Sequence, residues 1–356
     1  MKKECKMNQR KVVKAIMCVL AVVIMGVPIS SRTVMAAERI VVRDPGGEWS
    51  QAAKIAYYDA FRKETGIEVL GISSPTEPIS QIKSIVDTKS YVWDVSDLSM
   101  SAVGILGPAG YLEEIDMNAP DIRDFIPEAK SKWVVAVQVY AIVIAYNKEK
   151  YGSRGPANWA DFFDVKKFPG TRSFRKNPIE TFEAALLADG VPKEKLYPLD
   201  IPRAFAKLDK IKPHIAVWWS SGAQSAQLAK TREVDLIHAY NGRIQGAIDD
   251  GAPFQIVWNE AIWSPDGFAI PRGNPKVEIC QKFVKFCARP DRQAEFAMHI
   301  PYGAPNPNAF KFLPPERIKL MPLAPQYVDK IVYQQADYWV KNYETVMEKF
   351  NTWVTK

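Results

Sequence analysis

Hydrophobic positions along the chain alternate between short apolar runs and longer amphipathic stretches. The first apolar run, at residues 39–42, is followed by a Pro-Gly-Gly turn and an amphipathic stretch at 50–65 that Gly66 closes. A helix that ends at a glycine and leads into another apolar run is typical of a βα unit. The alternation therefore predicts an α/β fold that opens with βα units around a largely parallel sheet.

The same patterns predict the remaining elements. We expect strands at 67–72, 92–98, 216–218, 235–240, 253–258 and 267–270, and helices at 81–87, 102–110, 158–164, 178–189, 202–212, 223–230, 277–287 and 326–353. Residues 133–147 are expected to be extended and long enough to pass from one lobe to another. Ligands of such sheets bind beyond the carboxyl ends of the strands, so the loops at 44–49 and 97–101 are candidate binding loops.

The N-terminal segment has the pattern of a secretory signal peptide. A cationic run, MKKECKMNQRKVVK, precedes an apolar stretch at 15–29 and small residues at Val34 and Ala36. The apolar stretch is shorter than the roughly 20 residues that span a bilayer as a helix. We expect cleavage before Ala37 and export to the periplasm, with a retained anchor as the alternative.

Most of the net positive charge of the chain lies in that segment. The whole chain has 47 Lys and Arg residues against 40 Asp and Glu, a net charge of +7. Residues 1–36 hold seven of the bases and one of the acids, which leaves 40 against 39 and a net charge of +1. A nearly neutral surface gives no reason to expect a nucleic acid or an anionic membrane as partner.

Cysteine and histidine spacing indicates neither disulfides nor a metal site. Beyond residue 36 the only cysteines are Cys280 and Cys287, seven apart on an expected helix, so their Cα atoms are about 10.5 Å apart. A disulfide needs a much shorter separation, and we expect both in the core. The histidines are scattered, and we expect no metal and no cofactor.

A series of motifs resembles a known family over nearly all of residues 37–356. In order they are AFRKETGIEV, WDV leading into DLS, NWADFFD, REVDLIHAYNGR, SPDGFAIPRGNP and YGAPNPNA. Their order and spacing resemble the bacterial periplasmic solute-binding proteins of ABC importers, in particular the spermidine/putrescine-binding family.

The resemblance implies two α/β lobes of the type II-like periplasmic-binding-protein fold. The ligand would lie in the cleft between the lobes, which close over it about a hinge that the chain crosses more than once. The implied crossings are near 141–146, near 267–270 and around Phe310. Lobe one would be 37–145 plus 268–309, and lobe two 146–267 plus 310–356.

The resemblance also implies ligand contacts. An organic amine needs carboxylates for its ammonium and aromatic faces for its methylenes. Glu180 falls on a carboxylate that contacts an amine terminus, and Asp266 on one that binds an inner amine. Tyr240 and Tyr302 fall on aromatic walls.

Other positions depart from the family pattern. Polar residues stand where the polyamine binders carry an aromatic, an aspartate and a tryptophan: Ser101, Asn177 and Ser264. Trp263 is a candidate replacement for that tryptophan, and Glu48 and Trp49 are candidates in the longer first loop. Ser99, in the loop after the WDV strand, completes the candidate set.

One segment points to an anionic group. Ser220, Ser221 and Gly222 open an expected helix, whose free N–H groups favour an anion. Ser221 as a simple helix cap is the alternative. Arg243 has a similar pair of interpretations, an anion contact or a salt bridge to a neighbouring carboxylate.

The leading hypothesis is a monomeric periplasmic binding protein that delivers a small amine-bearing solute to an ABC permease in the inner membrane, driven by a cytoplasmic ATPase. A polyamine such as putrescine or spermidine is the favoured ligand. The alternatives are an opine-like or other amino compound, a thiamine-like cation or an aminophosphonate. A chemosensory role is compatible with the same sequence.

An enzyme is not expected, because the chain has no GxSxG, no HExxH and no cysteine nucleophile context. An exported hydrolase is the remote alternative. Iron-binding relatives need clustered tyrosines at the cleft, whereas the Tyr57-Tyr58 pair falls within an expected helix.

Overall fold

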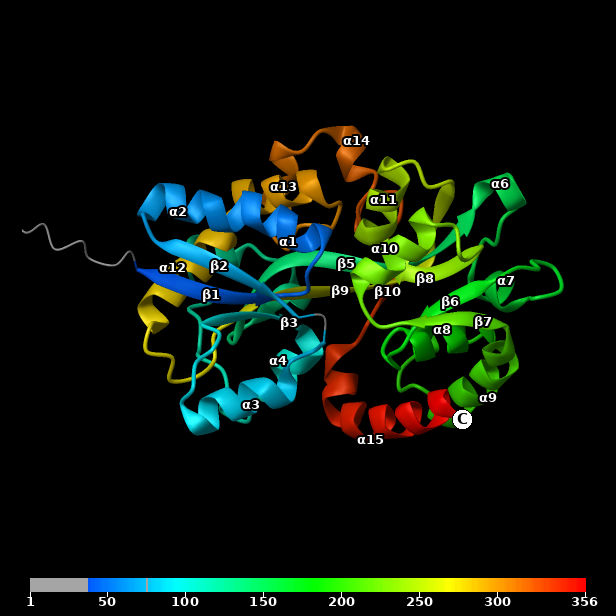
Figure 1. Cartoon of the computed structure of the whole chain (residues 1–356), viewed down its shortest axis with the longest axis horizontal. Helices are drawn as coiled ribbons and strands as arrows, with labels where there is room; N and C mark the ends of the chain where they lie inside the picture. Colours follow the sequence, from blue (N-terminus) through cyan, green and yellow to red (C-terminus); the bar gives the residue numbers. More distant parts are fainter. Residues whose placement is uncertain (1–37, 75) are drawn as a thin grey trace, which may run out of the picture. The chain divides into compact units, whose positions relative to one another are not determined.

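The computed structural model describes residues 38–74 and 76–356 (Figure 1). The expected signal peptide, residues 1–36, lies outside these residues. Within them, no helix combines the length and the apolar character needed to cross a membrane.

The strands of the described residues form one ten-stranded sheet. Its order is β2-β1-β3-β9-β5-β8-β6-β7, with β10 beside β9 and β4 beside β5. The strands are β1 Arg39–Asp44, β2 Glu68–Ser73, β3 Val95–Ser99, β4 Lys130–Ser131, β5 Val134–Asn147, β6 Arg172–Arg175, β7 Ile215–Trp219, β8 Leu236–Tyr240, β9 Phe254–Ala269 and β10 Val332–Tyr333.

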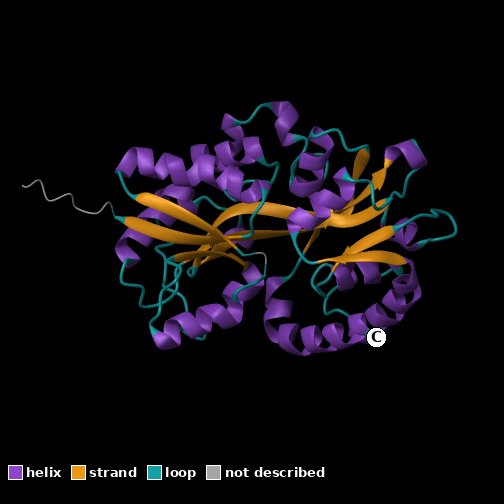
Figure 2. Cartoon of the chain, viewed as in Figure 1, coloured by secondary structure: helices purple, strands orange, loops and turns teal. Residues whose placement is uncertain are grey.

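Helices pack against both faces of this sheet (Figure 2). They are α1 Glu48–Ala53, α2 Ala60–Thr65, α3 Ile79–Thr88, α4 Met100–Leu106, α5 Pro120–Arg123, α6 Lys148–Tyr151, α7 Trp159–Phe163, α8 Thr181–Ala188, α9 Ile201–Ile211, α10 Gly222–Lys230, α11 Asn241–Asp249, α12 Val277–Cys287, α13 Pro290–His299, α14 Pro315–Ile318 and α15 Ala336–Thr355. The α/β class expected from the sequence is confirmed.

Two long central strands, β5 and β9, join the two lobes. They pair antiparallel from Val135↔Phe268 to Asn147↔Phe254. The C-terminal end of β9, at residues 266–269, pairs with β3. The C-terminal part of β5, at residues 142–146, pairs with β8. Each strand therefore belongs to both halves of the sheet, and the chain crosses between lobes along both of them (Figure 1).

The continuity of β9 differs from the sequence prediction of two strands at 253–258 and 267–270. The polar residues Asn259 and Glu260 interrupt its apolar pattern, and Glu260 has a φ of 60°. Hydrogen bonds with Trp159 hold Glu260, so the strand continues past this irregularity. In the opening lobe β1 pairs parallel with β2 and β3, as expected, and in the other lobe β6 pairs parallel with β7 and β8. The central strands β5 and β9 pair antiparallel with each other and with β3, β4 and β8, whereas the short β10 pairs parallel with β9.

The first long helix is continuous from Glu48 to Thr65, but its middle turns, Lys54–Asp59, are π-helical. Gly66 ends it at a φ of 78°, as its position in the sequence predicts. Tyr57 and Tyr58 are buried within it. Tyr57 Oη donates to Val137 O and Tyr58 Oη to Asp44 Oδ2, so the tyrosine pair is part of the core.

The C-terminal helix begins ten residues later than the predicted 326, at Ala336. The intervening Val332–Tyr333 is extended because it adds β10 to the edge of β9 at Ile262–Trp263. The side chain of Val340 lies against Gly104 of α4, whereas Phe350 packs on Phe182 of α8. Helix α15 therefore contacts both lobes.

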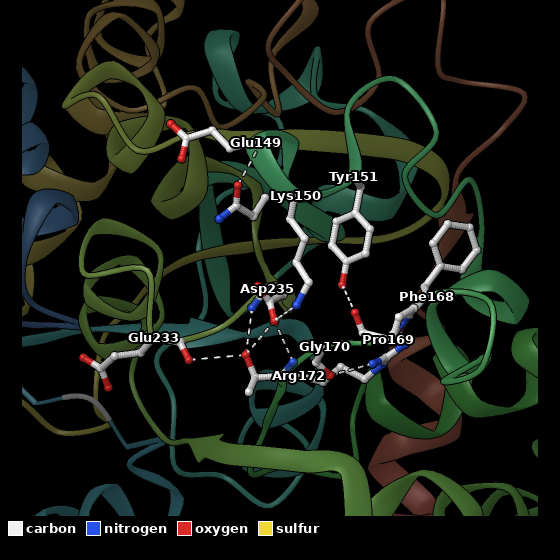
Figure 3. Close-up of polar contacts among 11 residues, drawn as sticks. Glu149, Lys150, Tyr151, Phe168, Pro169, Gly170, Arg172, Glu233 and Asp235 are labelled. Atoms are coloured by element: carbon white, nitrogen blue, oxygen red, sulfur yellow. Dashed lines mark hydrogen bonds and ion pairs between the residues drawn. The ribbon is translucent and has the colours of Figure 1, made fainter.

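A polar network secures the outer part of lobe two (Figure 3). Asp235 accepts hydrogen bonds from Lys150 Nζ at 2.7 Å and Thr171 N at 2.8 Å. The guanidinium of Arg172 donates to the carbonyls of Phe162 at 2.9 Å and Gly170 at 2.8 Å. These bonds fix the loop before β6 against β8. The two cysteines, Cys280 and Cys287, are free and buried, as expected.

Candidate functional site

A cavity of about 100 Å³ lies where the two lobes meet β5 and β9. Lobe one contributes Arg43 and Asp97, lobe two contributes Arg175 and Arg243, and the central strands contribute Tyr140 and Asp266. No cluster of His, Cys, Asp and Glu side chains within residues 38–74 and 76–356 is arranged to hold a metal ion.

Seven of the nine residues predicted as ligand contacts line this cavity: Trp49, Ser99, Glu180, Ser221, Tyr240, Asp266 and Tyr302. The other two, Glu48 and Trp263, do not. Glu48 Oε1 accepts from Lys230 Nζ at 2.9 Å. Trp263 packs on Tyr333. Side chains alternate along a strand, so Trp263 faces away from the side of β9 that carries Ser264 and Asp266.

Three carboxyl groups converge on the cavity from lobe one and β9, and we call Glu77, Asp97 and Asp266 the acidic group. In the β3–β9 ladder Ser99 lies opposite Asp266, which puts Asp97 and Asp266 diagonally on one face. Each residue has a buried oxygen without a hydrogen-bond partner in the described part of the chain: Glu77 Oε1, Asp97 Oδ1 and Asp266 Oδ1.

The electrostatics of the acidic group favour a cation. Burial, followed by the negative charges of Asp97 and Glu77, raises the pKa of Asp266 well above its ordinary value. Burial also raises the pKa of Asp97, and the charge of Arg43 opposes this shift. Burial likewise raises the pKa of Glu77. An ammonium group placed among these oxygens would offset their repulsion and supply the missing donors.

Arg43 holds the loop that carries Glu77. Its Nη1 donates to Asp97 O at 2.8 Å, and its Nη2 donates to the carbonyls of Ser74 and Thr76. Arg43 is 3% exposed, and its Nε lacks a partner among the described residues. Asp97 lies in one of the candidate binding loops predicted from the sequence, whereas Arg43 and Glu77 were not among the predicted contacts. Both come from segments with no distinctive motif.

Arg243 of α11 and the first residues of α10 form a second polar group, which we call the α10–α11 corner: Ser221, Gly222 and Arg243. Arg243 Nη2 donates to Gly46 O at 2.8 Å, while its buried Nη1 has no partner within 38–74 and 76–356. A Cβ at Gly222 would lie 2.8 Å from Arg243 Nε, so glycine permits this close approach.

The α10–α11 corner contains a helix cap and an arginine without an ion-pair partner among the described residues. Ser221 caps α10, because its Oγ accepts from Gln224 N at 3.2 Å. Arg243 forms no ion pair with any described residue. The corner therefore combines an unpaired guanidinium nitrogen with the positive end of a nine-residue helix, a combination suited to a carboxylate.

Glu180 has a different environment from the acidic group. It is fully buried, and both of its oxygens accept hydrogen bonds from protein groups: Oε1 from Tyr140 Oη at 2.7 Å and Oε2 from Arg175 Nη1 at 2.5 Å. The guanidinium of Arg175 lies 5.2 Å from the centre of the Tyr240 ring. Glu180 thus orients Arg175 over this aromatic wall.

Residues 56–323 match the family model for the bacterial extracellular solute-binding protein. The chain belongs to this family. Its members are substrate-binding components of transport systems, and the chain is a substrate-binding protein of an ABC transporter with the two-lobed fold that the sequence predicted.

Two relatives differ in what their names say they bind. The solute-binding protein is 34% identical to the gamma-aminobutyric acid-binding protein of Pseudomonas aeruginosa over 326 residues, 90% of this chain and 92% of the relative. It is 25% identical to the spermidine/putrescine-binding periplasmic protein of Escherichia coli over 278 residues, 75% and 79% of the two chains.

Two similar solved structures have titles that specify glucopine or GABA as the bound compound. The A. tumefaciens B6 binding protein MotA in complex with glucopine superposes with a TM-score of 0.84 at 33% identity, covering 89% of this chain and 99% of that one. The Atu4243-GABA receptor superposes with a TM-score of 0.81 at 34% identity, covering 89% and 98%. The similarity is greater to binders of amino compounds than to the polyamine binder, so the favoured polyamine ligand gives way to the alternative.

Proposed function

We propose that this protein captures a small zwitterion of the 4-aminobutyrate class in the periplasm and delivers it to a membrane permease. The observation that carries the proposal is the pairing of two kinds of buried, unpartnered groups on one cavity. The acidic group supplies oxygen acceptors for an ammonium, and Arg243 supplies a nitrogen donor for a carboxylate. A polyamine would leave that donor without an anion.

Cavity size supports a compact ligand. At about 10–15 Å³ for each water-sized group, a volume of about 100 Å³ suits a molecule of the size of 4-aminobutyrate better than a sugar-bearing opine. The aromatic walls at Tyr140, Trp219 and Tyr240 would cover its methylenes. The two relatives whose names specify γ-aminobutyrate are 34% identical to this chain, which supports the same ligand class.

The lobes would close over the ligand about β5 and β9. The Ala294–Ala297 part of α13 packs in one cluster with Leu313 and Met321. We therefore place the third crossing after Met321 rather than at Phe310, with lobe one at 37–145 plus 268–321 and lobe two at 146–267 plus 322–356. Only the closed, loaded form would engage the permease productively.

A thermal-shift screen of the purified protein tests this proposal. The panel comprises 4-aminobutyrate, its shorter and longer homologues, glucopine, thiamine, an aminophosphonate, putrescine and spermidine. A ligand at 100 times its Kd stabilises the native protein by about 2.7 kcal/mol, so a true ligand raises the melting temperature by several degrees. We expect the short ω-amino acids to give the largest shifts. Shifts with polyamines alone would contradict the proposal.

A further inference from the structure

The acidic group carries more negative charge than its surroundings offset. The charge of Arg43 opposes the raised pKa of Glu77 and Asp97, but its donors go to Asp97 O and to the carbonyls of Ser74 and Thr76 rather than to a carboxylate. Arg175 is paired with Glu180 at 2.5 Å. The charge of Arg175 opposes the raised pKa of Glu77 and Asp266, but the paired charge of Glu180 adds to the raised pKa of Asp266. Three ionised carboxylates would thus face Arg43 as the one neighbouring arginine that is not paired with a carboxylate among the described residues.

The other titratable groups around the acidic group add no positive charge. Asp44 of β1 is a further acid, which accepts from Tyr58 Oη at 3.0 Å and raises the pKa of Asp97. Four tyrosine hydroxyls around the cavity stay neutral, because burial raises the pKa of each: Tyr140 of β5, Tyr240 of β8, Tyr302, and Tyr343 of α15. Arg243 is held at the α10–α11 corner by Gly46 O.

We propose that the acidic group binds a proton when the ligand is absent and releases it when the ligand's ammonium enters. Glu77, Asp97 and Asp266 share this proton, and it passes to the solvent on binding. The three carboxyl groups lose one proton and gain one neighbouring ammonium, so the net charge of the three groups together with the ammonium equals their net charge before binding. This inference rests on the proposed function, because it requires a ligand with an ammonium group.

Three observations support the exchange. Each member of the acidic group has one buried oxygen without a partner in the described chain, so each can hold a proton or accept from an ammonium. The diagonal placement of Asp97 and Asp266 on neighbouring strands brings two like charges together. In agreement, burial raises the pKa of both groups. The negative charges of Asp97 and Glu77 add to the shift of Asp266, and the negative charge of Glu77 adds to the shift of Asp97.

The proton exchange determines the direction in which ligand affinity changes with pH. Because binding releases protons, affinity increases with pH until the ligand's own amine begins to lose its proton. Each released proton makes Kd about tenfold smaller per pH unit. The protein would therefore hold its ligand less tightly in an acidified periplasm than in a neutral one.

Titration calorimetry with 4-aminobutyrate tests the inference. Heats of binding at pH 7 are compared in phosphate and in Tris, two buffers with different heats of ionisation, and Kd is measured at pH 6 and pH 7. We expect release of about half to one proton and a Kd about three- to tenfold smaller at pH 7 than at pH 6. Asp97→Asn should reduce the number of protons released. The matched control Glu149→Gln, on the exposed surface, should leave it unchanged.

The outcomes separate the two proposals. Binding of 4-aminobutyrate with equal heats in both buffers and a constant Kd would overturn the proton exchange and leave the proposed function standing. If no ω-amino acid binds, the proposed function fails and the exchange fails with it. The buffer comparison uses the wild-type protein, so the test does not depend on the folding of the Asp97 variant.

Discussion

Tyr140 Oη donates a hydrogen bond of 2.7 Å to Glu180 Oε1. The bond joins the central strand β5 to the residue that precedes α8 in lobe two, and Glu180 holds this position with a φ of 61°. Arg175 donates to the second carboxylate oxygen, so both oxygens of Glu180 already accept a hydrogen bond from the protein. The geometry supports a role for Glu180 in positioning Arg175. Contact of Glu180 with a ligand amine, which the family resemblance implies, stays a prediction.

Removing the Tyr140 hydroxyl should destabilise the protein. Tyr140→Phe leaves the buried Glu180 Oε1 without its donor, which should cost about 1–3 kcal/mol of unfolding free energy, measured by urea denaturation. Tyr91→Phe is a matched control, because the Tyr91 hydroxyl bonds Arg272 O at an exposed position. Equal losses of unfolding free energy in the two variants would show that the buried Tyr140–Glu180 bond stabilises the protein no more than the exposed Tyr91 bond does.

Arg243 should determine recognition of the ligand's carboxylate. Arg243→Gln should weaken 4-aminobutyrate binding by about 1.5–3 kcal/mol, or roughly 10- to 150-fold in Kd, because a charge-assisted hydrogen bond is lost. Arg232→Gln, which removes an exposed arginine paired with Glu149, should not change Kd in calorimetry. An Arg243 variant that folds and binds as tightly as wild type would exclude the α10–α11 corner as the carboxylate site.

Glu183 should make stability depend on pH. It is fully buried, and Oε1 accepts from Tyr197 Oη at 2.6 Å and Trp339 Nε1 at 2.7 Å. Burial raises the pKa of Glu183 to about 7. Between about pH 4.5 and 7 the folded protein therefore binds more protons at this residue than the unfolded chain, and its contribution to stability falls as pH rises.

The raised pKa values of Asp97 and Asp266 also make stability fall as pH rises, so the pH dependence of the wild type alone does not identify Glu183. The difference in stability between Glu183→Gln and wild type removes this shared background. The amide keeps an oxygen acceptor for Tyr197 and Trp339 but cannot ionise. We expect the variant to gain up to about 3 kcal/mol relative to wild type between pH 4.5 and 8, measured by chemical denaturation at each pH. A constant difference between the two proteins over this range would contradict the shifted pKa.

The local sequence pattern was sufficient for most elements of the fold. The predicted helix at 277–287 has the bounds of α12, and the extended segment at 133–147 contains β5. The pattern failed where tertiary contacts override it. Glu260 continues β9 through a polar stretch because Trp159 bonds it, and Val332–Tyr333 is extended because β9 offers an open edge.

The candidate site was only partly accessible from the sequence. Asp266, Tyr240 and Tyr302 were found through family resemblance, and all three line the cavity. Trp263 does not line the cavity, because the side on which a strand residue lies depends on register, which the sequence pattern does not specify. Arg43 and Glu77 were missed because their role arises from contacts between loops far apart in the sequence.

The comparison of 4-aminobutyrate with putrescine tests the zwitterion site most directly. The two molecules share a four-carbon chain and one ammonium, and differ in whether a carboxylate or a second ammonium stands at the other end. Calorimetry of the wild-type protein should give a Kd about 100-fold smaller for 4-aminobutyrate, because Arg243 gains a carboxylate partner in one case and meets a cation in the other. Equal or tighter binding of putrescine would contradict the assignment of this cavity to a zwitterion.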